Sequence, residues 1–436
     1  MMAKEKKSDV TAVVVGCGDR GTTYCTAAYD AGLPFKVVAA VDPDENRLRL
    51  MREKYGVLPE MCFKDMKDIL AKGRIANCVI NGTMDQLHVP TSLPFLEQGY
   101  NMLLEKPVIN NAKDLFKIRD TARKHGCKLM VCHVLRYSPF YRKAKELIDA
   151  GEIGEIMHME TSERVGVAHA SVSYIRGKWN NESECGSSFL LAKCCHDIDL
   201  LCWFNNKTRP VTADSFGGRD FIVPEKAPKG AGTRCLVDCP AAVRESCKFY
   251  AKPLYLDHNV WQAYTWQCTG KNYWDVTPQE REESLKTYNP HGLCAYKVKS
   301  DLIDHQTLTL QFNNGSTATH TLLSAAARGS ERRLFISGTK GEIEGFAGDG
   351  KFVLSKFNPA TIGHTETVFD FNATDGTAMG GHYGGDAALI RDFIDLMNGA
   401  IPSVSCTSIE DSINGHLCVY AADAAMKKGR RMPVLE

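Results

Sequence analysis

The chain has 436 residues, 44% of them hydrophobic, so it is long enough to bury a large core and to form two domains. Its 53 basic residues balance its 52 acidic residues, and the formal net charge is +1. This balance gives no electrostatic reason to expect nucleic acid or an anionic membrane as a partner. We instead expect a small ligand that is uncharged or carries its charge locally.

We expect neither a signal peptide nor a membrane span. Met1 to Asp9 is polar and lysine-rich, and nowhere do about 20 apolar residues run together. The 17 cysteines are scattered through apparent strands and helices, which suits buried thiols in a reducing compartment better than a disulfide framework. The sequence therefore predicts a cytoplasmic protein.

A dinucleotide-binding turn is predicted at Val13 to Gly21, which reads V-V-V-G-C-G-D-R-G. The three β-branched residues indicate a buried parallel strand. Gly16, Gly18 and Gly21 then have the G-x-G-x-x-G spacing, which lets a backbone turn tightly against a pyrophosphate at a helix N-terminus. The alternative is a glycine-rich turn that binds nothing.

The residues around this turn bear on the choice of nucleotide. A second apolar run, Val37 to Val41, ends at Asp42, about 20 residues after the last glycine, where an acid bonds the adenosine ribose hydroxyls. Asp42 therefore favours NAD over NADP. Arg20 follows Asp19 at the start of the predicted helix and keeps NADP open, because an arginine there could meet a phosphate or a 2′-phosphate.

The first third of the chain alternates strand-like and helix-like stretches, which is typical of a doubly wound parallel sheet. Apolar periodicity predicts the helices Glu45 to Tyr55, Val89 to Gln98 and Ala112 to His125. Short apolar runs predict the strands Ala76 to Asn81, Asn101 to Leu104 and Lys128 to His133.

From about Arg136 the pattern changes to that of an α+β domain with a large, mainly antiparallel open sheet, which we predict for residues 136–407. One amphipathic helix, Phe140 to Ala150, is followed by alternating runs such as Ile156 to Val165 and His305 to Phe312, which are typical of antiparallel strands. Helical patterns return at Gly384 to Asn398 and Ser408 to Lys428. We expect the last segment, residues 408–436, to pack back on the body of the protein.

Several motifs in combination resemble those of the Gfo/Idh/MocA oxidoreductases, which act on sugars and cyclitols. Besides the glycine fingerprint they are T-M-D-Q-L-H at Thr83 to His88, L-E-K-P at Leu104 to Pro107, L-R-Y-S-P-F-Y at Leu135 to Tyr141 and I-S-G-T-K-G-E-I at Ile336 to Ile343. The resemblance spans nearly the whole chain. It implies an NAD-binding Rossmann domain over residues 9–135 and a substrate-binding domain after it.

The resemblance also implies roles for single residues. Thr83, His88, Glu105 and Lys106 would belong to the cofactor site, with Glu105 and Lys106 beside the nicotinamide. The open face of the second sheet would form the sugar pocket. The chain would assemble into a homo-oligomer, a dimer or a tetramer.

Lys106 has a physical case beside this analogy. At the C-terminal end of a parallel strand, where open α/β sheets bind ligands, an ammonium group can hydrogen-bond a substrate hydroxyl and stabilise the alkoxide that forms as hydride leaves. The alternative is an exposed lysine paired with Glu105. The position after a strand and before Pro107 favours the catalytic role.

The family's second catalytic piece is a histidine with an aspartate four residues before it. The matching stretch is L-L-A-K-C-C-H-D-I-D-L-L, in which His196 and Asp199 match but Ala192 replaces the aspartate. A dehydrogenase needs a base for the hydroxyl proton, so we expect His196 to act with another partner. Lys193 is the candidate, because residues three apart on a helix share a face. Alternatively, Lys193 pairs with Asp197.

These residues predict an NAD-dependent oxidoreductase that removes a hydride from a ring hydroxyl, at carbon 3 in our interpretation, of a sugar, glycoside or cyclitol. The altered histidine helix supports a second hypothesis, a redox-neutral glycosidase that forms a 3-keto sugar, eliminates the aglycone, adds water and returns the hydride. Such a cycle needs a second base, and His133 is a candidate unless it is a structural histidine. A non-catalytic sugar or nucleotide sensor is a third hypothesis.

Three regions supply further candidate substrate contacts. Arg136 lies between the domains, and the stretch Ser173 to Asn180 carries four aromatic or cationic side chains: Tyr174, Arg176, Lys178 and Trp179. Such groups suit a pyranose, whose apolar face stacks and whose hydroxyls need donors, although a loop with solvated charges is the alternative. The glycine-rich stretch Gly380 to Asp386 permits a close approach, by which His382, Tyr383 and Asp386 would reach the sugar.

Three cysteines are not explained by an oxidoreductase. Cys235, Cys239 and Cys247 lie in a polar, proline-bearing stretch. Three thiols so near one another can bind a structural zinc ion, with Cys268 or His258 as the fourth ligand. The spacing is not that of a standard zinc finger, and free thiols in a loop insertion are the alternative.

Overall fold

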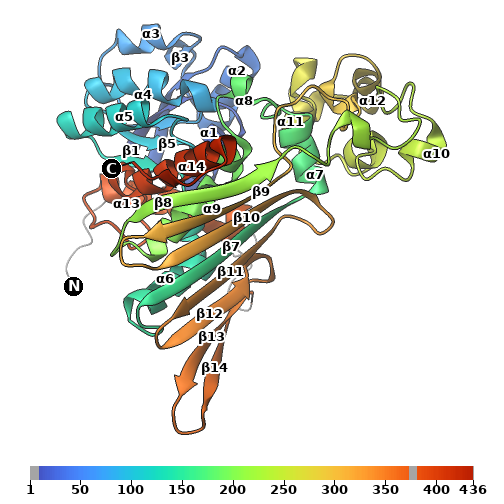
Figure 1. Ribbon diagram of the computed structural model, residues 1–436. Helices are drawn as coiled ribbons and strands as arrows, with labels where there is room; N and C mark the ends of the chain where they lie inside the picture. Colours follow the sequence, from blue (N-terminus) through green and yellow to red (C-terminus); the bar gives the residue numbers. More distant parts are fainter. Residues whose placement is uncertain (1–8, 373–380, 436) are drawn as a thin grey trace.

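The computed structural model describes residues 9–372 and 381–435. Figure 1 shows a small sheet surrounded by helices and a long sheet that extends away from it, with α13 (Gly385–Met397) and α14 (Ile409–Lys428) between them. Gly380, where the predicted glycine-rich segment begins, lies outside the described residues. Among the helices of the described residues, none is long and apolar enough to cross a membrane.

The first sheet has six strands in the order β3-β2-β1-β4-β5-β6, all paired in parallel. The prediction of a doubly wound parallel sheet is confirmed. The order reverses between β1 and β4, and sheets of this kind bind ligands outside the carboxyl ends of the strands at such a point. The strands are β1 (Val10–Val15), β2 (Phe35–Val41), β3 (Cys62–Phe63), β4 (Cys78–Asn81), β5 (Asn101–Leu104) and β6 (Leu129–Val131).

The flanking helices begin and end at capping residues. The Asp44 side chain accepts a hydrogen bond from the backbone N–H of Asn46 at the start of α2, and Gly56, with φ of 68°, ends that helix. Asn111 caps α5 in the same way. The helices are α1 (Asp19–Asp30), α2 (Glu45–Tyr55), α3 (Met66–Leu70), α4 (His88–Glu97) and α5 (Ala112–Lys124).

The second sheet has nine strands in the order β14-β13-β12-β11-β7-β10-β9-β8-β15. It is mainly antiparallel, as predicted, but β7 runs parallel to β10 because the chain crosses over through α9 between them. The predicted antiparallel pairing of Ile156 to Val165 therefore holds on the β11 side only. The strands are β7 (Ile156–Gly166), β8 (Pro210–Gly218), β9 (His305–Phe312), β10 (Thr317–Ala326), β11 (Glu331–Gly338), β12 (Gly341–Phe346), β13 (Lys351–Asn358), β14 (Gly363–Asp370) and β15 (Met432–Pro433).

Helices cover one face of the long sheet and lie behind its strands in Figure 1. α9 (Phe189–Phe204) is buried along its whole length and packs on β7 and β10, which is why its sequence is apolar on all sides except for a few charged groups. α6 (Pro139–Asp149) contributes Phe140, whose ring centroid lies 5.3 Å from that of Phe352 on β13. α7 (Val167–His169), a π-helical segment (Ala170–Ile175) and α8 (Glu182–Cys185) connect β7 to α9.

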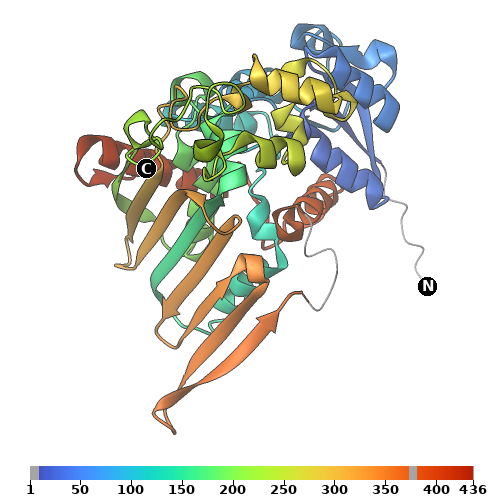
Figure 2. The same ribbon diagram turned by 90° about the vertical axis from the view of Figure 1, so that its right-hand side faces the viewer.

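Residues 219–304, between β8 and β9, form loops and short helices that we call the insertion. It has a small core of its own, which includes Tyr255, Trp266 and Leu285. Figures 1 and 2 show the insertion beside one end of the long sheet and against the first domain. Its α-helices are α10 (Ala241–Arg244), α11 (Gln262–Thr265) and α12 (Pro278–Lys286).

Candidate active site

The turn after β1 requires glycine at two of its three fingerprint positions. Gly16 has φ of 79°, and a Cβ there would lie 2.7 Å from backbone atoms of Gly82 and Thr83. A Cβ at Gly21 would lie 2.2 Å from the carbonyl oxygen of Gly16. A Cβ at Gly18 would meet nothing nearer than Arg47, at 3.7 Å. The turn is thus closed on the sheet side and open on the outer side.

The N-terminus of α1 faces that open side. Within the described chain no side chain caps this helix end, so its first N–H groups and the helix dipole can bind a pyrophosphate. Asp42, only 2% exposed, accepts hydrogen bonds from the backbone N–H groups of Cys17 at 2.8 Å and Asp44 at 2.9 Å. Asp19 is the first residue of α1. This geometry fits NAD, with Asp42 where an acid would bond the adenosine ribose.

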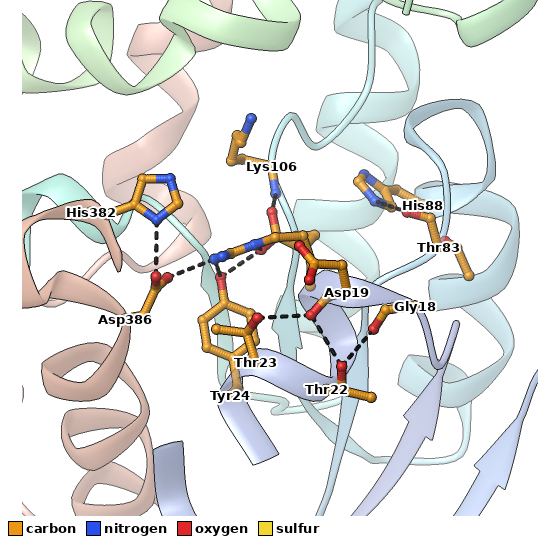
Figure 3. Close-up of polar contacts among 12 residues, drawn as sticks. Gly18, Asp19, Thr22, Thr23, Tyr24, Thr83, His88, Lys106, His382 and Asp386 are labelled. Carbon is orange, nitrogen blue, oxygen red and sulfur yellow. Dashed lines mark hydrogen bonds and ion pairs between the residues drawn. The ribbon is translucent and has the colours of Figure 1, made fainter. Parts of the chain in front are cut away.

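The arginine beside Asp42 is Arg47, whose Nη1 lies 3.3 Å from Asp42 Oδ2. Arg20, which the sequence placed near a phosphate, points elsewhere: its Nε donates to Glu105 at 2.8 Å and its Nη2 donates to Asp386 at 2.6 Å. Figure 3 shows that this series of polar contacts continues from Asp386 to His382, whose Nδ1 lies 2.9 Å from the carboxylate. Arg20 therefore links the carboxyl end of β5 to α13.

Glu105 and Asp386, the two buried carboxylates that contact Arg20, are held in their charged form. Burial raises the pKa of Glu105, but Arg20, Lys106 and the Tyr24 hydroxyl outweigh it, and the pKa lies below its usual value. Burial also raises the pKa of Asp386, and Arg20 and His382 together lower it further than burial raises it. Negative charge is thus fixed beside the lysine that follows Glu105.

The loops after β4 and β5 are braced against each other. Nδ1 of His88 lies 2.6 Å from the carbonyl oxygen of Pro107, and Nε2 lies 3.1 Å from that of Thr83. The Thr83 hydroxyl donates to Asn81 Oδ1 at 2.8 Å. Thr83 and His88 therefore brace the turn that carries Lys106.

Lys106 reaches from the end of β5 to α9. Its Nζ donates to the carbonyl oxygen of Ala192 at 2.7 Å, and its backbone N–H donates to Glu105 Oε2 at 3.0 Å. Figure 3 shows the side chain pointing away from the glycine turn. The ammonium group is therefore aimed at the histidine helix, and not at the Glu105 carboxylate as the alternative interpretation required.

His196 lies one turn after Ala192 on the same helix. It is 3% exposed, and its Nδ1 has no hydrogen-bond partner among the described residues. Burial lowers the pKa of His196 well below its usual value, and Lys106 and His133 lower it further, so the ring is neutral at pH 7. A neutral imidazole beside an ammonium group can accept a proton from a substrate hydroxyl.

Lys193 pairs with Glu163 on β7, with Nζ 3.2 Å from Oε1, and not with Asp197 as the alternative interpretation had it. Arg332 on β11 lies 2.9 Å from Asp197 and 2.8 Å from Glu163. Burial lowers the pKa of Lys193, while Glu163 raises it. These two acids and two cations form a buried quartet on the face of the sheet that α9 covers.

The interdomain segment holds two predicted substrate contacts. Arg136 is fully buried and donates twice to Asp199, at 2.6 Å each, and also pairs with Asp411. It therefore joins α9 to α14 and has no exposed surface for a sugar. The two ring nitrogens of His133 have no hydrogen-bond partner in the part of the chain that the structure describes, and its ring centroid lies 5.7 Å from that of His196.

Arg176 also serves the fold. It is 1% exposed, and it donates to the carbonyl oxygens of Leu293 at 2.7 Å and Phe249 at 2.9 Å. Both acceptors belong to the insertion, so Arg176 fastens the insertion to the segment before α9. Tyr174 is 4% exposed, and its ring centroid lies 4.5 Å from that of Phe189.

Lys178 and Trp179 lie where the insertion meets the first domain. Lys178 Nζ is 4.3 Å from the ring centroid of Trp179 and 5.0 Å from that of Tyr264 on α11. Trp179 Nε1 donates to Asp85 at 3.2 Å, and the Tyr264 hydroxyl donates to Asp19 Oδ2 at 3.4 Å. This aromatic group lies at the N-terminus of α1.

His382 and Tyr383 both have left-handed backbone conformations, with φ of 51° and 57°. Such conformations are strained in residues other than glycine and often mark functional sites. The ring centroid of His382 lies 5.7 Å from that of His196, and burial lowers the pKa of His382. His382 therefore lies beside His196 as a second imidazole with a lowered pKa.

The predicted cysteine cluster gains a different fourth member. Cys235, Cys239 and Cys247 line one cavity in the insertion together with Cys294. The fourth ligands suggested by the sequence are elsewhere: Cys268 and His258 are exposed residues outside the lining of this cavity.

Sequence reasoning missed Glu163, Arg332 and Tyr264. Glu163 had a usable signal, because it occupies an inward position of a strand whose alternation was recognised, and a charged residue at such a position needs a partner. Arg332 takes the same kind of position on β11. Tyr264 lies in the insertion, where no motif or periodicity marks it.

Two protein-family models match the chain. One is described as oxidoreductase family, NAD-binding Rossmann fold, and matches residues 10–133. The other is described as oxidoreductase family, C-terminal alpha/beta domain, and matches residues 145–434. Together they cover both sheets.

Similar proteins were found among curated sequences. The putative oxidoreductase YteT of Bacillus subtilis is 24% identical over 369 residues, which are 82% of each chain. An inositol 2-dehydrogenase of Corynebacterium glutamicum is 24% identical over 191 residues, which are 44% of this chain and 52% of that protein.

Solved structures share the fold. An oxidoreductase from Agrobacterium radiobacter, in complex with NAD+, L-tartaric acid and magnesium, superposes with a TM-score of 0.67 at 18% identity, over 98% of this chain and 99% of the other. The apo scyllo-inositol dehydrogenase of Lactobacillus casei gives a TM-score of 0.62 at 17% identity, over 98% and 99% of the two chains.

Proposed function

The chain belongs to the Gfo/Idh/MocA oxidoreductase family, and from this premise we propose that it removes a hydride from a ring hydroxyl of a sugar, glycoside or cyclitol. The first domain is an NAD-binding Rossmann domain, and bound NAD supplies a hydride acceptor. The observation that carries the proposal is the approach of Lys106 to α9 one turn before His196. The ammonium group of Lys106 therefore lies one turn of α9 from the neutral imidazole of His196, at the carboxyl end of the parallel sheet.

Each of these groups has one task. Lys106 donates a hydrogen bond to the substrate hydroxyl and stabilises its developing negative charge. His196 accepts the hydroxyl proton, because its Nδ1 has no hydrogen-bond partner among the described residues and its low pKa keeps the ring neutral. Glu105, which Arg20 holds in its charged form, positions the lysine backbone through the 3.0 Å bond. Lys193 contributes positive potential to the same pocket from its pair with Glu163.

The substrate class follows from the groups around these two. His169 stacks on Trp261 with ring centroids 3.9 Å apart and lies 5.5 Å from Tyr174. Burial lowers the pKa of His169, and the positive charge of Lys193 on α9 lowers it further. Flat rings next to several hydrogen-bonding cations suit a polyol ring with an apolar face.

NAD is proposed over NADP because of Asp42. Its buried carboxylate occupies the ribose position and would repel a 2′-phosphate. Arg47, at 3.3 Å, partly offsets this charge, so we expect a preference for NAD and not an absolute exclusion of NADP.

A redox-neutral glycosidase is the second candidate, and the insertion favours it. The Tyr264 hydroxyl bonds Asp19, and the carbonyl oxygen of Gly270 accepts a bond from Asn46 Nδ2 at 3.1 Å. The insertion thereby spans the edge of the first domain from the start of α1 to α2, where a bound dinucleotide would lie beneath it. An enzyme that returns its hydride has no need to exchange its cofactor, and His382 offers the second base that elimination requires.

The two candidates separate in one assay. Purified protein with added NAD is mixed with free sugars, cyclitols and chromogenic glycosides, and NADH absorbance and aglycone release are followed in the same wells. Steady NADH formation with a free sugar or cyclitol establishes a net dehydrogenase. Aglycone release without NADH build-up establishes the glycosidase. No turnover of either kind by protein that binds NAD would contradict both and leave a sensor.

Two controls complete the assay. Lys106→Met must abolish whichever activity is found, while Lys36→Met, at an exposed lysine on β2, must not. If the protein is a net dehydrogenase, substrates deuterated at single ring carbons then test the proposed carbon 3, since the carbon that loses hydride gives a primary isotope effect.

A further inference from the structure

Four cysteines from separate parts of the insertion line one cavity. Besides Cys235, Cys239, Cys247 and Cys294, the lining consists of apolar and aromatic residues and of two arginines, Arg176 and Arg244. The sequence distance between Cys247 and Cys294 hides this grouping, which exists only in the folded insertion. Free thiols do not need one another as neighbours, so their convergence calls for an explanation.

The backbone places Cys235 and Cys294 on the same face of a short two-stranded ladder. Arg234 and Leu293 form an antiparallel bridge. On either side of this bridge the N–H of Cys235 donates to Gly292 O, and the N–H of Cys294 donates to Thr233 O, each at 2.8 Å. Residues adjacent to a bridged position point to the face opposite that position's side chain. The side chains of Cys235 and Cys294 therefore leave the ladder on the same face.

A locked turn brings the third cysteine back. The N–H groups of Val237 and Asp238 donate to the carbonyl oxygen of Arg234 at 3.1 and 3.2 Å. The Asp238 carboxylate accepts hydrogen bonds from the Thr233 hydroxyl at 2.6 Å and from the backbone N–H groups of Thr233 and Arg234 at 2.9 and 2.7 Å. This turn reverses the chain between Cys235 and Cys239.

The fourth cysteine, Cys247, lies just after α10. Its N–H donates to the carbonyl oxygen of Arg244 at 3.1 Å. Cys247 lines the same cavity as Cys235 and Cys294. The neighbouring charge is positive, since Arg176 is buried in the same wall.

We propose that Cys235, Cys239, Cys247 and Cys294 bind one structural zinc ion as a tetrahedral thiolate site. Zn²⁺ displaces four protons from four thiols, and the resulting site carries a charge of about −2. Arg176 and Arg244 match this charge from the cavity wall. No carboxylate lines the cavity in the described part of the chain, which favours a soft, thiolate-binding metal over calcium or magnesium.

The sulfur atoms must turn inward to bind. Among the described residues, the groups that already hold at least three candidate ligand atoms within 4.8 Å of one another are Cys194–Asp197–His320 and Asp220–Asp304–His305. A change of χ1 rotamer moves a cysteine sulfur by about 3 Å without moving the backbone. Rotation of these side chains would bring the four sulfur atoms together around the ion.

The two preassembled groups are less suited to a metal. Asp197 is engaged by Arg332 at 2.9 Å. Asp304 accepts three backbone N–H bonds, from Asp220, Phe221 and Ile222. Protein partners already satisfy their charge, whereas the cysteine cavity has cations in its wall and no counter-charge but its own thiols.

A metal would explain how the insertion is held together. Its separate core contains few fully buried apolar side chains, and small units of this kind usually need a disulfide or a metal for stability. The zinc ion would join the ladder, the turn and the segment after α10. It would thus support the part of the chain that reaches the edge of the first domain through Tyr264 and Gly270.

The experiment is metal analysis of the full-length protein, purified without chelator. We expect about one zinc per chain, falling below about one third in Cys294→Ser and Cys235→Ser. Cys268→Ser, at an exposed cysteine of the same insertion, is the matched control and should retain the metal. Full zinc content in Cys294→Ser, or metal-free wild-type protein after supplying zinc, would overturn the proposal.

A second measurement on the wild-type chain does not depend on the variants folding. Titration with a mercurial reagent in the presence of a metallochromic dye should release one zinc as about four thiols react. Cobalt substitution should give intense thiolate-to-metal charge-transfer absorption in the near ultraviolet. Peptide mapping that finds a disulfide among these four cysteines in freshly purified protein would instead contradict the zinc site.

Discussion

The buried polar groups on and beside α9 have two kinds of surroundings. Lys193, Asp197 and Asp199 each have an ion partner, at 3.2, 2.9 and 2.6 Å. By contrast, the Nδ1 of His196 and both ring nitrogens of His133 have no hydrogen-bond partner among the described residues. All five side chains are buried. Burial alone therefore does not distinguish a structural polar group from a functional one.

The difference lies in what each arrangement costs. A buried charge is tolerated when its partners are complete. A buried nitrogen without a partner costs about 1–3 kcal/mol and persists where a ligand makes the missing bond. The groups with ion partners should therefore govern stability, and the groups without a hydrogen-bond partner should govern turnover.

Lys106→Met should have the largest effect, because it removes the donor at the site of the developing alkoxide. We expect kcat/KM to fall by about 10³-fold, with the melting temperature nearly unchanged. Steady-state kinetics and thermal unfolding of the same preparation measure both. A loss of less than about tenfold would show that the lysine is not part of the chemistry.

Asp199→Asn breaks the ion pair between Asp199 and Arg136. It leaves the fully buried Arg136 with Asp411 as its remaining carboxylate, and we expect a loss of about 3 kcal/mol in the free energy of unfolding. The kcat of the folded enzyme should not change. Asp411→Asn is the matched control and should cost less, since the Asp411 side chain is 37% exposed. A large kcat effect with unchanged stability would reverse the assignment.

His196→Gln tests the histidine whose Nδ1 has no hydrogen-bond partner among the described residues. Removal of the base should lower kcat by about 10²-fold. Stability should be kept or slightly raised, because a buried nitrogen without a partner is lost. The acid limb of the kcat/KM profile of the wild type should lie below the usual histidine pKa, since burial, Lys106 and His133 lower it. An unfolding transition at clearly lower temperature would instead place His196 with the structural groups.

The smallest effect concerns pH and stability. Burial lowers the pKa values of His320 and His416 to about 3. The unfolded chain binds protons on these groups first, so stability present above about pH 6.5 is lost as pH falls toward 3, by about 2 kcal/mol per histidine between pH 7 and 5.

Asp423 opposes this trend, because burial raises its pKa to about 6 and its protonation on acidification favours the folded state. Denaturant unfolding from pH 7 to 5 should nevertheless show a net decline, because burial also lowers the pKa values of other histidines, among them His133, His196 and His291. His320→Gln should flatten it. An unchanged slope in this variant would mean that His320 titrates normally in the folded protein.

Much of the fold could be predicted because its signals are local. The bounds of α2, β5 and β9 match the predicted stretches residue for residue. The patterns that predict these three elements depend on neighbours within a few residues. The parallel pairing of β7 with β10 was missed, because a strand's own sequence does not specify which strand lies beside it.

Of the candidate site, the sequence by itself determined the glycine turn, the lysine after β5 and the replacement of an aspartate by Ala192. Each of these is a chemical fact of one short segment. Only the tertiary structure decided that Arg136 and Arg176 serve the fold, that Lys193 pairs with Glu163, and that Cys294 joins the other three cysteines. Partners far apart in the chain decide whether a buried charge or thiol is satisfied, and no local pattern records them.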